Sequence, residues 1–243
     1  MKHVQLLFLR HGHCQGGEIL RGRTDVDLSE LGVQQMHHSF TELNELPSII
    51  FSSPLKRCAL FSDLIAKQHR LPIRILDGLQ EIDFGDWDGQ SWQSLYDTYA
   101  DKIDLYWATP WDKALTPQNG EHFIDFDNRV SACVAAIIKQ LLLLPAPKAA
   151  NLNKPDAINK ALVVTHGGVI RSVLGHILGD GFSECDAKSP QNQLARGVFK
   201  QFNLPYGALI EIDVFIDAND VVTEPLKAQQ ISCRLNWPMP SFK

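Results

Sequence analysis

Apolar residues along this chain gather either in short unbroken runs or in longer stretches with helical spacing. Residues 3–9 form a nearly continuous apolar run, which is typical of a strand buried on both faces. Similar runs predict further strands over residues 48–51, 72–76, 161–165 and 207–216, the last of them near an edge of the sheet. Apolar positions three and four residues apart predict helices over residues 29–43, 54–69, 119–144 and 167–178.

Two local signals mark the starts of predicted helices. Ser29, followed by Glu30, is expected to cap the first helix, because a serine side chain can accept a hydrogen bond from the free backbone N–H groups there. Ser53-Pro54 places a capping residue and a first-turn proline ahead of the second helix, which is expected to end at about His69.

The alternation of strands and helices predicts an α/β domain with a mainly parallel sheet. Residues 88–118 contain or adjoin four of the five tryptophans and are expected to form a helical insertion. Residues 145–160 are polar and rich in proline, asparagine and alanine, so we expect a solvated linker there. The chain, residues 1–243, is therefore predicted to be a single domain with these two interruptions.

Composition and charge restrict the class of protein. The 243 residues are 44% apolar and 21% charged, close to the averages for soluble globular proteins. A net charge of −5 without any lysine or arginine run argues against nucleic acid and anionic membranes as partners. No stretch approaches the ~18–20 apolar residues of a membrane span. The N-terminal run is too short for a signal peptide, so a cytoplasmic location is expected.

The five cysteines are widely scattered and form no C-x-x-C pair. This spacing favours reduced thiols over a disulfide framework or a zinc knuckle.

Chemically useful side chains follow several of the predicted strands. Arg10 and His11 follow the first strand, Arg57 the second, Glu81 the third, and His166 the strand over residues 161–165. Ligands of open α/β sheets collect at the carboxyl ends of strands. Two arginines, two histidines and a carboxylate are therefore expected to meet at one edge of the sheet.

This combination suits a phosphomonoester substrate. Two guanidiniums can each hold phosphoryl oxygens through paired hydrogen bonds, and a neutral imidazole can attack phosphorus and carry the phosphoryl group. A second imidazole and the backbone N–H groups that open the helix after His166 add further donors. A carboxylic acid can protonate the leaving oxygen and later take a proton from water. Because the fixed cations supply the positive charge, we expect no metal or other cofactor.

The segment Leu9-Arg10-His11-Gly12 resembles the R-H-G signature of the histidine phosphatase superfamily, whose members have the phosphoglycerate mutase-like fold. Further segments resemble that family in the same order along the chain: Gly22–Ser29 with Gly32 and Gln35, Ser52–Arg57, Glu81–Gly89, and Val164–Gly168. The resemblance covers roughly residues 4–180. It implies a three-layer, doubly wound architecture with helices on both faces of the sheet.

The resemblance also implies roles for individual residues. His11 would be the phosphorylated nucleophile, Glu81 the proton donor, and Arg10, Arg57 and His166 the phosphate pocket. The backbone of Gly167 would add a donor to that pocket. Two residues of the second matched segment, Arg23 and Thr24, are candidate substrate contacts.

The segment after Glu81 distinguishes branches of the family. Phosphoglycerate mutases carry an Arg-His-Tyr-Gly type of sequence there, whereas Ile82–Trp87 resembles the phosphatase branch, in particular alpha-ribazole phosphatase of cobalamin nucleotide-loop assembly. Residues 116–121, with Phe123 and Arg129 behind them, support the same branch. Alpha-ribazole 5′-phosphate is thus the expected substrate. A broad-specificity or fructose-2,6-bisphosphatase-like phosphatase, a mutase, and a catalytically dead phospho-ligand-binding relative remain alternatives.

Two positions depart from the family pattern. His13 stands where many members have an acidic residue, and Gly17 where many have an asparagine that touches the phosphate. Three histidines, at 11, 13 and 166, could instead suggest a metal site, but the neighbouring arginines would repel a cation. Trp87 or Trp92 could line a pocket for a flat base, although packing is the simpler role. The partner expected is a small-molecule phosphomonoester, and the sequence predicts no oligomeric state.

Overall fold

The computed structural model describes residues 1–145, 158–178, 203–217 and 231–236. Within this part of the chain, six strands form one sheet. Their order across the sheet is β3 (Ile73–Ile75), β2 (Ile49–Ser52), β4 (Asn159–Thr165), β1 (Lys2–Arg10), β5 (Leu209–Ile216) and β6 (Ile231–Leu235). The first four are parallel, while β5 is antiparallel to β1 and β6 to β5. The prediction of a mainly parallel α/β sheet is confirmed.

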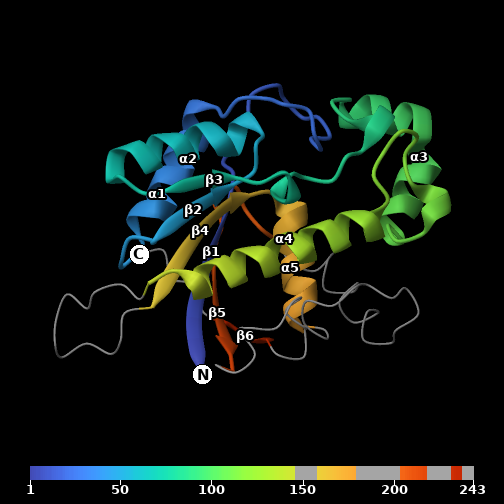
Figure 1. The fold of residues 1–243 in the computed structure, drawn as a ribbon. Coiled ribbons are helices and arrows are strands. Elements are labelled where there is room, and N and C mark those ends of the chain that lie inside the picture. Colours follow the sequence, from blue (N-terminus) through green and yellow to red (C-terminus); the bar gives the residue numbers. More distant parts are fainter. Residues whose placement is uncertain (146–157, 179–202, 218–230, 237–243) are drawn as a thin grey trace.

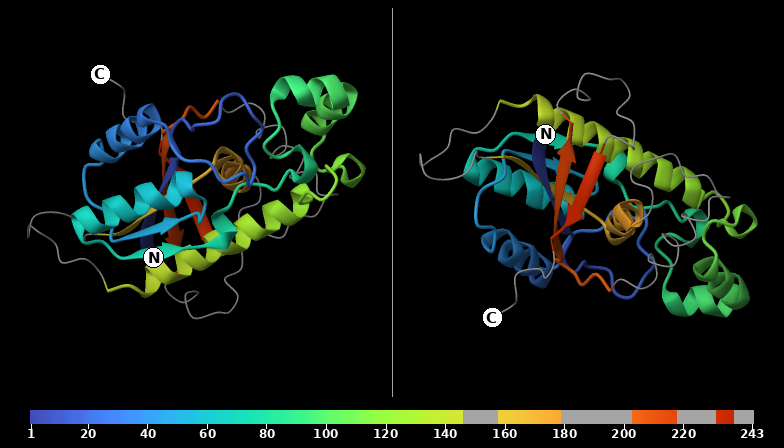
Figure 2. Two further views of the ribbon diagram at one scale, coloured as in Figure 1. Left: turned by 90° about the horizontal axis from the view of Figure 1, so that it is seen from above. Right: turned by 90° about the horizontal axis from the view of Figure 1, so that it is seen from below.

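Helices cover both faces of the sheet and give three layers (Figures 1 and 2). The α-helices are α1 (Glu30–Thr41), α2 (Lys56–His69), α3 (Trp92–Ala108), α4 (Phe123–Leu143) and α5 (Gly167–Leu178). Short 3₁₀ turns are η1 (Asp77–Leu79), η2 (Gly85–Trp87) and η3 (Lys113–Leu115). Helices α1 and α2 lie on one face, and α4 and α5 on the other (Figure 2).

The period-two alternation of β1 explains the two cores. Leu6 and Phe8 pack into the larger cluster with α4 and α5, whereas Leu7 and Leu9 pack into the smaller cluster with α1 and α2. All four side chains are essentially inaccessible to solvent. A strand that faces a core on each side needs apolar residues on both faces, which is why residues 6–9 are all apolar.

Two of the predicted helix starts have different outcomes. Ser29 caps α1 as expected, since its Oγ accepts a hydrogen bond from Gly32 N at 3.1 Å. The cap predicted at Ser53 is wrong, because α2 begins at Lys56 with Leu55 at the N-cap position. The Ser53 hydroxyl instead lies 2.8 Å from Nε2 of His166.

The helix predicted from residue 119 begins at Phe123. Residues 117–120 form a turn closed by a hydrogen bond from Gly120 N to Pro117 O, and the ring of His122 caps α4 by accepting from Ile124 N at 3.1 Å. Strand β6 has no counterpart in the predictions. It pairs with β5 and forms the edge of the sheet, so β5 is the second strand from that edge.

Residues 88–118, predicted as a helical insertion, contain α3 and η3, and α3 stands beyond the N-terminal end of α4 (Figure 1). Trp87 is buried and packs edge-on against Tyr106 of α3, so it does not line an open pocket. Most of the predicted linker lies outside the described residues. Its last two residues belong instead to β4, where Asn159 pairs with Val4 and its side-chain amide donates to Leu141 O and Leu144 O.

Candidate active site

The predicted site residues meet at the carboxyl edge of the sheet. His11 follows β1 and His166 follows β4, which are neighbouring parallel strands. Their rings lie 5.2 Å apart between centroids, and the backbone N of His11 donates to Thr165 O at 2.9 Å. Sheet pairing thus brings together two histidines that are far apart in the sequence.

His11 is buried, and the surrounding charges keep its ring neutral. Burial, followed by the positive charges of Arg57 and Arg10, holds its pKa well below the ordinary 6.5. Nδ1 lies 2.9 Å from Gly12 O, and because a carbonyl can only accept, we assign the ring proton to Nδ1. This tautomer leaves the lone pair on Nε2. A neutral imidazole with an available lone pair is a competent nucleophile.

His166 is inaccessible to solvent and contacts Arg57. The Arg57 Nε–H donates to Nδ1 of His166 at 3.2 Å, so the ring proton is assigned to Nε2, which donates to Ser53 Oγ. Burial, Arg57 and His11 hold the pKa of His166 well below 6.5. The guanidinium of Arg57 also donates to Gly22 O at 2.6 Å and to Thr24 O at 2.8 Å.

Arg10 lies at the end of β1, close to Tyr206 and to Gly167 at the start of α5. Its Cζ stands 4.4 Å from the ring centroid of Tyr206, and its Nη1 donates to Leu204 O. Its buried Nε has no hydrogen-bond partner among the described residues. A Cβ added to Gly167 would lie 3.2 Å from that Nε, so glycine at this position lets the start of α5 approach the guanidinium closely.

Glu81 reaches the start of α5 from the loop after η1. Its Oε2 accepts from Gly168 N at 2.9 Å and its Oε1 accepts from Ile82 N at 3.1 Å. The first N–H groups of a helix have no partner within it, and a carboxyl oxygen of Glu81 serves as the acceptor for that of Gly168. A Cβ on Gly168 would overlap Oε1 of Glu81, so only glycine allows this approach.

The segment Gly22–Thr24 is held by a single carboxylate, that of Asp88. Its Oδ1 accepts from Gly22 N and Thr24 N, each at 3.0 Å, and from Thr24 Oγ1 at 2.6 Å. Its Oδ2 accepts from Arg23 N at 2.7 Å and from Phe84 N at 3.3 Å. The hydroxyl of Thr24 is therefore directed toward Asp88.

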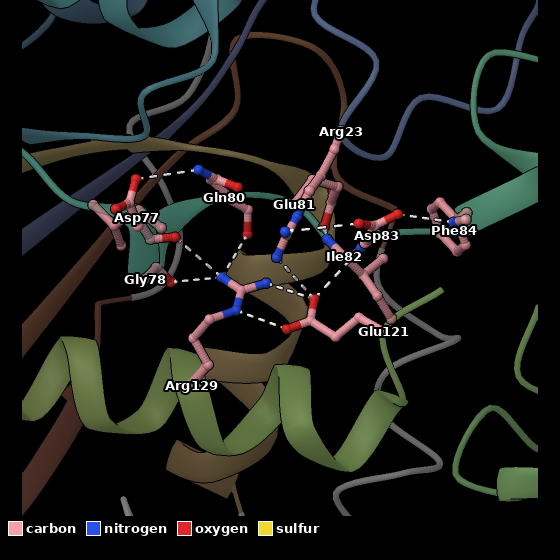
Figure 3. Close-up of polar contacts among 12 residues, drawn as sticks. Arg23, Asp77, Gly78, Gln80, Glu81, Ile82, Asp83, Phe84, Glu121 and Arg129 are labelled. Atoms are coloured by element: carbon pink, nitrogen blue, oxygen red, sulfur yellow. Dashed lines mark hydrogen bonds and ion pairs between the residues drawn. The ribbon is translucent and has the colours of Figure 1, made fainter. Parts of the chain in front are cut away.

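Arg23 extends from this segment toward two acidic side chains, as Figure 3 shows. Its guanidinium lies 3.7 Å from Asp83 Oδ2 and 3.6 Å from Glu121 Oε2. The side chain is 39% exposed, so it can still be reached from solvent. The roles of Arg23 and Thr24 as substrate contacts stay predictions.

His13 and Gly17, the two departures from the family pattern, each contact another residue near the site. Nδ1 of His13 lies 2.8 Å from Ser29 Oγ, so the ring is tied to the cap of α1. Gly17 has a φ of +73°, a left-handed conformation that favours glycine, and its carbonyl accepts from Arg21. The positive charge of Arg21 also contributes to the low pKa of His11.

Three residues of the site were missed by sequence reasoning. Tyr206 packs against both Arg10 and His11, Ser53 contacts His166, and Asp88 holds the segment that receives Arg57. Ser53 and Asp88 lie inside segments that match the family, and that position could have marked them. Tyr206 lies outside the matched segments and carries no comparable signal. Among the described residues, no three histidine, cysteine or acidic side chains are grouped to hold a metal, and no helix is long and apolar enough to cross a membrane.

Comparison with protein families decides the identity of the chain. The family model of the histidine phosphatase superfamily (branch 1) matches residues 6–193. The chain belongs to this superfamily. It is a phosphoric monoester hydrolase, and the expected resemblance is confirmed.

Individual relatives are distant. The adenosylcobalamin/alpha-ribazole phosphatase of Escherichia coli (strain K12) is 26% identical over 179 residues, covering 72% of this chain and 80% of the relative. The glucosyl-3-phosphoglycerate phosphatase of Mycolicibacterium vanbaalenii is 29% identical over 182 residues, covering 74% of this chain and 76% of the relative.

Solved structures confirm the fold. Mycobacterial glucosyl-3-phosphoglycerate phosphatase superposes with a TM-score of 0.71 at 22% identity, covering 97% of this chain and 98% of that chain. The alpha-ribazole phosphatase of Shigella flexneri superposes with a TM-score of 0.66 at 20% identity, covering 96% and 95%. The predicted phosphoglycerate mutase-like architecture of this histidine phosphatase is confirmed.

Proposed function

We propose that this histidine phosphatase hydrolyses phosphomonoesters through a phosphohistidine on His11, without a metal ion. The observation that carries the proposal is the state of His11. It is buried, neutral and 5.2 Å from the second histidine ring, with Arg57 and Arg10 both lowering its pKa. Its nucleophilic nitrogen thus stands where two fixed guanidiniums can receive a phosphoryl group.

The reaction would run in two displacements. In the first, Nε2 of His11 attacks phosphorus and the bond from phosphorus to the ester oxygen breaks, while Glu81 gives its proton to that oxygen. In the second, water attacks the phosphohistidine, Glu81 takes a proton from the water, and inorganic phosphate leaves. The enzyme returns to its starting protonation state.

Charge on the transferred group would be balanced by Arg10, Arg57 and the opening of α5. The Nε–H of Arg10 is available to a ligand, as far as the described residues show. Arg57 donates three hydrogen bonds to protein groups, and a guanidinium carries five N–H groups, so others can turn to a phosphoryl oxygen. The backbone N–H of Gly167 adds a neutral donor at the helix start. In this proposal His166, which lies against Arg57, donates to the phosphoryl group after release from Ser53.

We propose alpha-ribazole 5′-phosphate as the substrate, and cobalamin nucleotide-loop assembly as its setting. Two findings support this choice. The segment Ile82–Trp87 resembles that branch, and the alignment with the alpha-ribazole phosphatase of Escherichia coli covers 80% of that relative.

Glucosyl-3-phosphoglycerate is a second candidate substrate. The mycobacterial phosphatases named for it match this chain at slightly higher identity and with the higher TM-score of the two structures compared. This substrate carries a carboxylate close to the phosphate, whereas alpha-ribazole 5′-phosphate does not. A preference between the two therefore reports whether the site has a cation for a second anionic group.

A substrate panel assayed with EDTA present tests the proposal. The panel contains both candidates together with fructose 2,6-bisphosphate, 3-phosphoglycerate and p-nitrophenyl phosphate, ranked by kcat/KM from phosphate release. We expect alpha-ribazole 5′-phosphate to rank first and EDTA to leave activity unchanged. Loss of activity restored by a divalent ion would refute the metal-free mechanism. Isomerisation of 3-phosphoglycerate in place of phosphate release would indicate a mutase.

A further inference from the structure

Arg129 of α4 contacts the loop that carries Glu81 at several points (Figure 3). Its Nη1 lies within hydrogen-bond distance of three backbone carbonyl oxygens, at 3.3 Å from Asp77 O, 3.1 Å from Gly78 O and 3.1 Å from Gln80 O. These carbonyls belong to the turn that leads directly into Glu81. One guanidinium thus binds three carbonyls of the turn before the carboxylate, while Thr165 Oγ1 donates to a fourth, Leu79 O, at 2.8 Å.

Glu121 holds the other side of the same loop. Arg129 donates to both of its carboxylate oxygens, from Nε at 2.8 Å and from Nη2 at 2.7 Å. Asp83 N donates to Glu121 Oε2 at 3.4 Å, and Glu121 N donates to Asp83 O at 2.8 Å. The Arg129–Glu121 pair therefore contacts the chain before Glu81 and the chain after it.

The loop that carries Glu81 packs closely against α4 and against the turn before Glu121. A Cβ on Gly78 would overlap the side chain of Cys133, one turn beyond Arg129 on α4. A Cβ on Gly85 would overlap Gln118 O in the turn that precedes Glu121. Both side chains of the pair are largely buried, at 21% exposed for Arg129 and 15% for Glu121. A bidentate pair of this kind, with its partners largely buried, has a well-defined geometry.

We infer that Arg129 and Glu121 are positioning residues that fix the Glu81 carboxyl at the leaving oxygen of the substrate. The inference rests on the proposed role of Glu81. The two residues act through the loop that carries Glu81, and we expect their main effect on the reaction to be on proton transfer. Glu121 also lies 3.6 Å from Arg23, a predicted substrate contact, and an effect through Arg23 would change both classes of substrate alike. Proton transfer matters most for a poor leaving group, because its oxygen cannot depart as an anion.

The test compares an alkyl phosphate with p-nitrophenyl phosphate for Arg129→Lys and Glu121→Gln. Lysine keeps the charge but cannot contact Glu121 and three carbonyls at once. We expect kcat/KM for the alkyl phosphate to fall ~10- to 100-fold, within the range of general acid catalysis, and for the aryl phosphate to fall less than ~3-fold. In a Glu81→Gln background, Arg129→Lys is expected to cause little further loss, because the acid is already absent.

Arg234→Lys provides a control at a second arginine–carboxylate pair, whose arginine is more exposed. Arg234 also binds one carboxylate, that of Asp213, through Nε and Nη2, but on β6 and away from the Glu81 loop. This variant should leave both substrates unaffected. If Arg129→Lys fails to fold, Glu121→Gln carries the test, since it leaves the carbonyl contacts of Arg129 in place.

Three results would overturn the inference. Equal losses on both substrates would mean that the pair only supports the fold, and so would full additivity with Glu81→Gln. If Glu81→Gln itself shows no dependence on the leaving group, the proposed acid is wrong and this inference falls with it. Leaving-group dependence in Glu81→Gln alone overturns the positioning role and leaves the proposed function intact.

Discussion

Arg57 and Asp88 bind opposite edges of the same short segment of backbone. Asp88 accepts hydrogen bonds from the N–H groups of Gly22, Arg23 and Thr24, while Arg57 donates to the carbonyls of Gly22 and Thr24. The two side chains have opposite charges and are joined through three peptide units. The position of the Arg57 guanidinium therefore depends on the Asp88 carboxylate, which acts on it through the backbone of residues 22–24.

Asp88→Asn is expected to weaken the phosphate pocket. The amide NH₂ of asparagine cannot accept a hydrogen bond, so the donors bound to one of the two Asp88 oxygens lose their acceptor. The backbone of residues 22–24, which binds Arg57, is then expected to shift. We expect kcat/KM to fall on the order of tenfold or more for aryl and alkyl phosphates alike, and inhibition by orthovanadate to weaken. Asp63→Asn, at an exposed pair with Lys67, is the control. Unchanged vanadate inhibition would contradict the role given to Asp88.

His11→Ala should abolish turnover while the protein stays folded. The ring is buried at the carboxyl edge of β1, yet it makes few hydrogen bonds, so its loss removes the nucleophile with limited effect on the sheet. Mass spectrometry of wild-type enzyme that is quenched rapidly and without acid should find a phosphoryl group on His11. Substantial residual activity in His11→Ala would rule out the phosphohistidine mechanism.

Glu81→Gln should affect substrates according to their leaving groups. For a ribose 5′-oxygen, which needs a proton to leave, we expect kcat/KM to fall ~10²–10⁴-fold, the usual contribution of general acid catalysis. For p-nitrophenyl phosphate the loss should be far smaller. kcat/KM is the right measure because it reports the steps up to formation of the phosphoenzyme. Equal losses would move attention to Asp83, on the same loop.

Stability should fall as the pH drops below about 6.5, the ordinary histidine value. His11 and His166 stay neutral in the folded protein because their pKa values are held well below 6.5, whereas in the unfolded chain they take up protons near that pH. The unfolded state then binds more protons, so acid favours unfolding, by about 1 kcal/mol per histidine one pH unit below 6.5. Urea unfolding at pH 7.5 and 5.5 measures this difference.

A matched pair of variants identifies the groups responsible for the pH dependence. His166→Asn should reduce the loss of stability between the two pH values, because one buried histidine no longer titrates on unfolding. Gln34→Ala, which exchanges one uncharged side chain for another at an exposed position on α1, should leave the loss unchanged. An unchanged pH dependence in His166→Asn would show that folding does not lower the pKa of this ring.

The sequence was most informative where burial in a strand or position at the end of a strand alone determines the residue type. The nearly continuous apolar run of β1 reflects two cores, one on each face, and the residues directly after the strands could be assigned to one edge of the sheet. Parallel pairing of β1 with β4 then places His11 beside His166 without further information.

Features that depend on contacts between distant loops could not be predicted. Ser53 reads as a helix cap, but the hydroxyl lies next to His166, a group of another strand. Glu121 could simply have favoured the start of α4, and only the folded chain brings Arg129 and the Glu81 loop to its carboxylate. Strand β6 is short and half-buried, so its pattern is weak compared with the central strands.

Gly168 is a position where one substitution would change the proposed acid and leave the rest of the site in place. Any side chain there would displace the Glu81 carboxyl from the start of α5, while Arg10, Arg57 and both histidines would keep their own supports. A glycine codon becomes an alanine codon by one base change. If Glu81 is the proposed acid, the same fold could pass in one mutation from hydrolysing alkyl phosphomonoesters to binding them with little turnover, which is a short route from a phosphatase to a phosphate-binding protein.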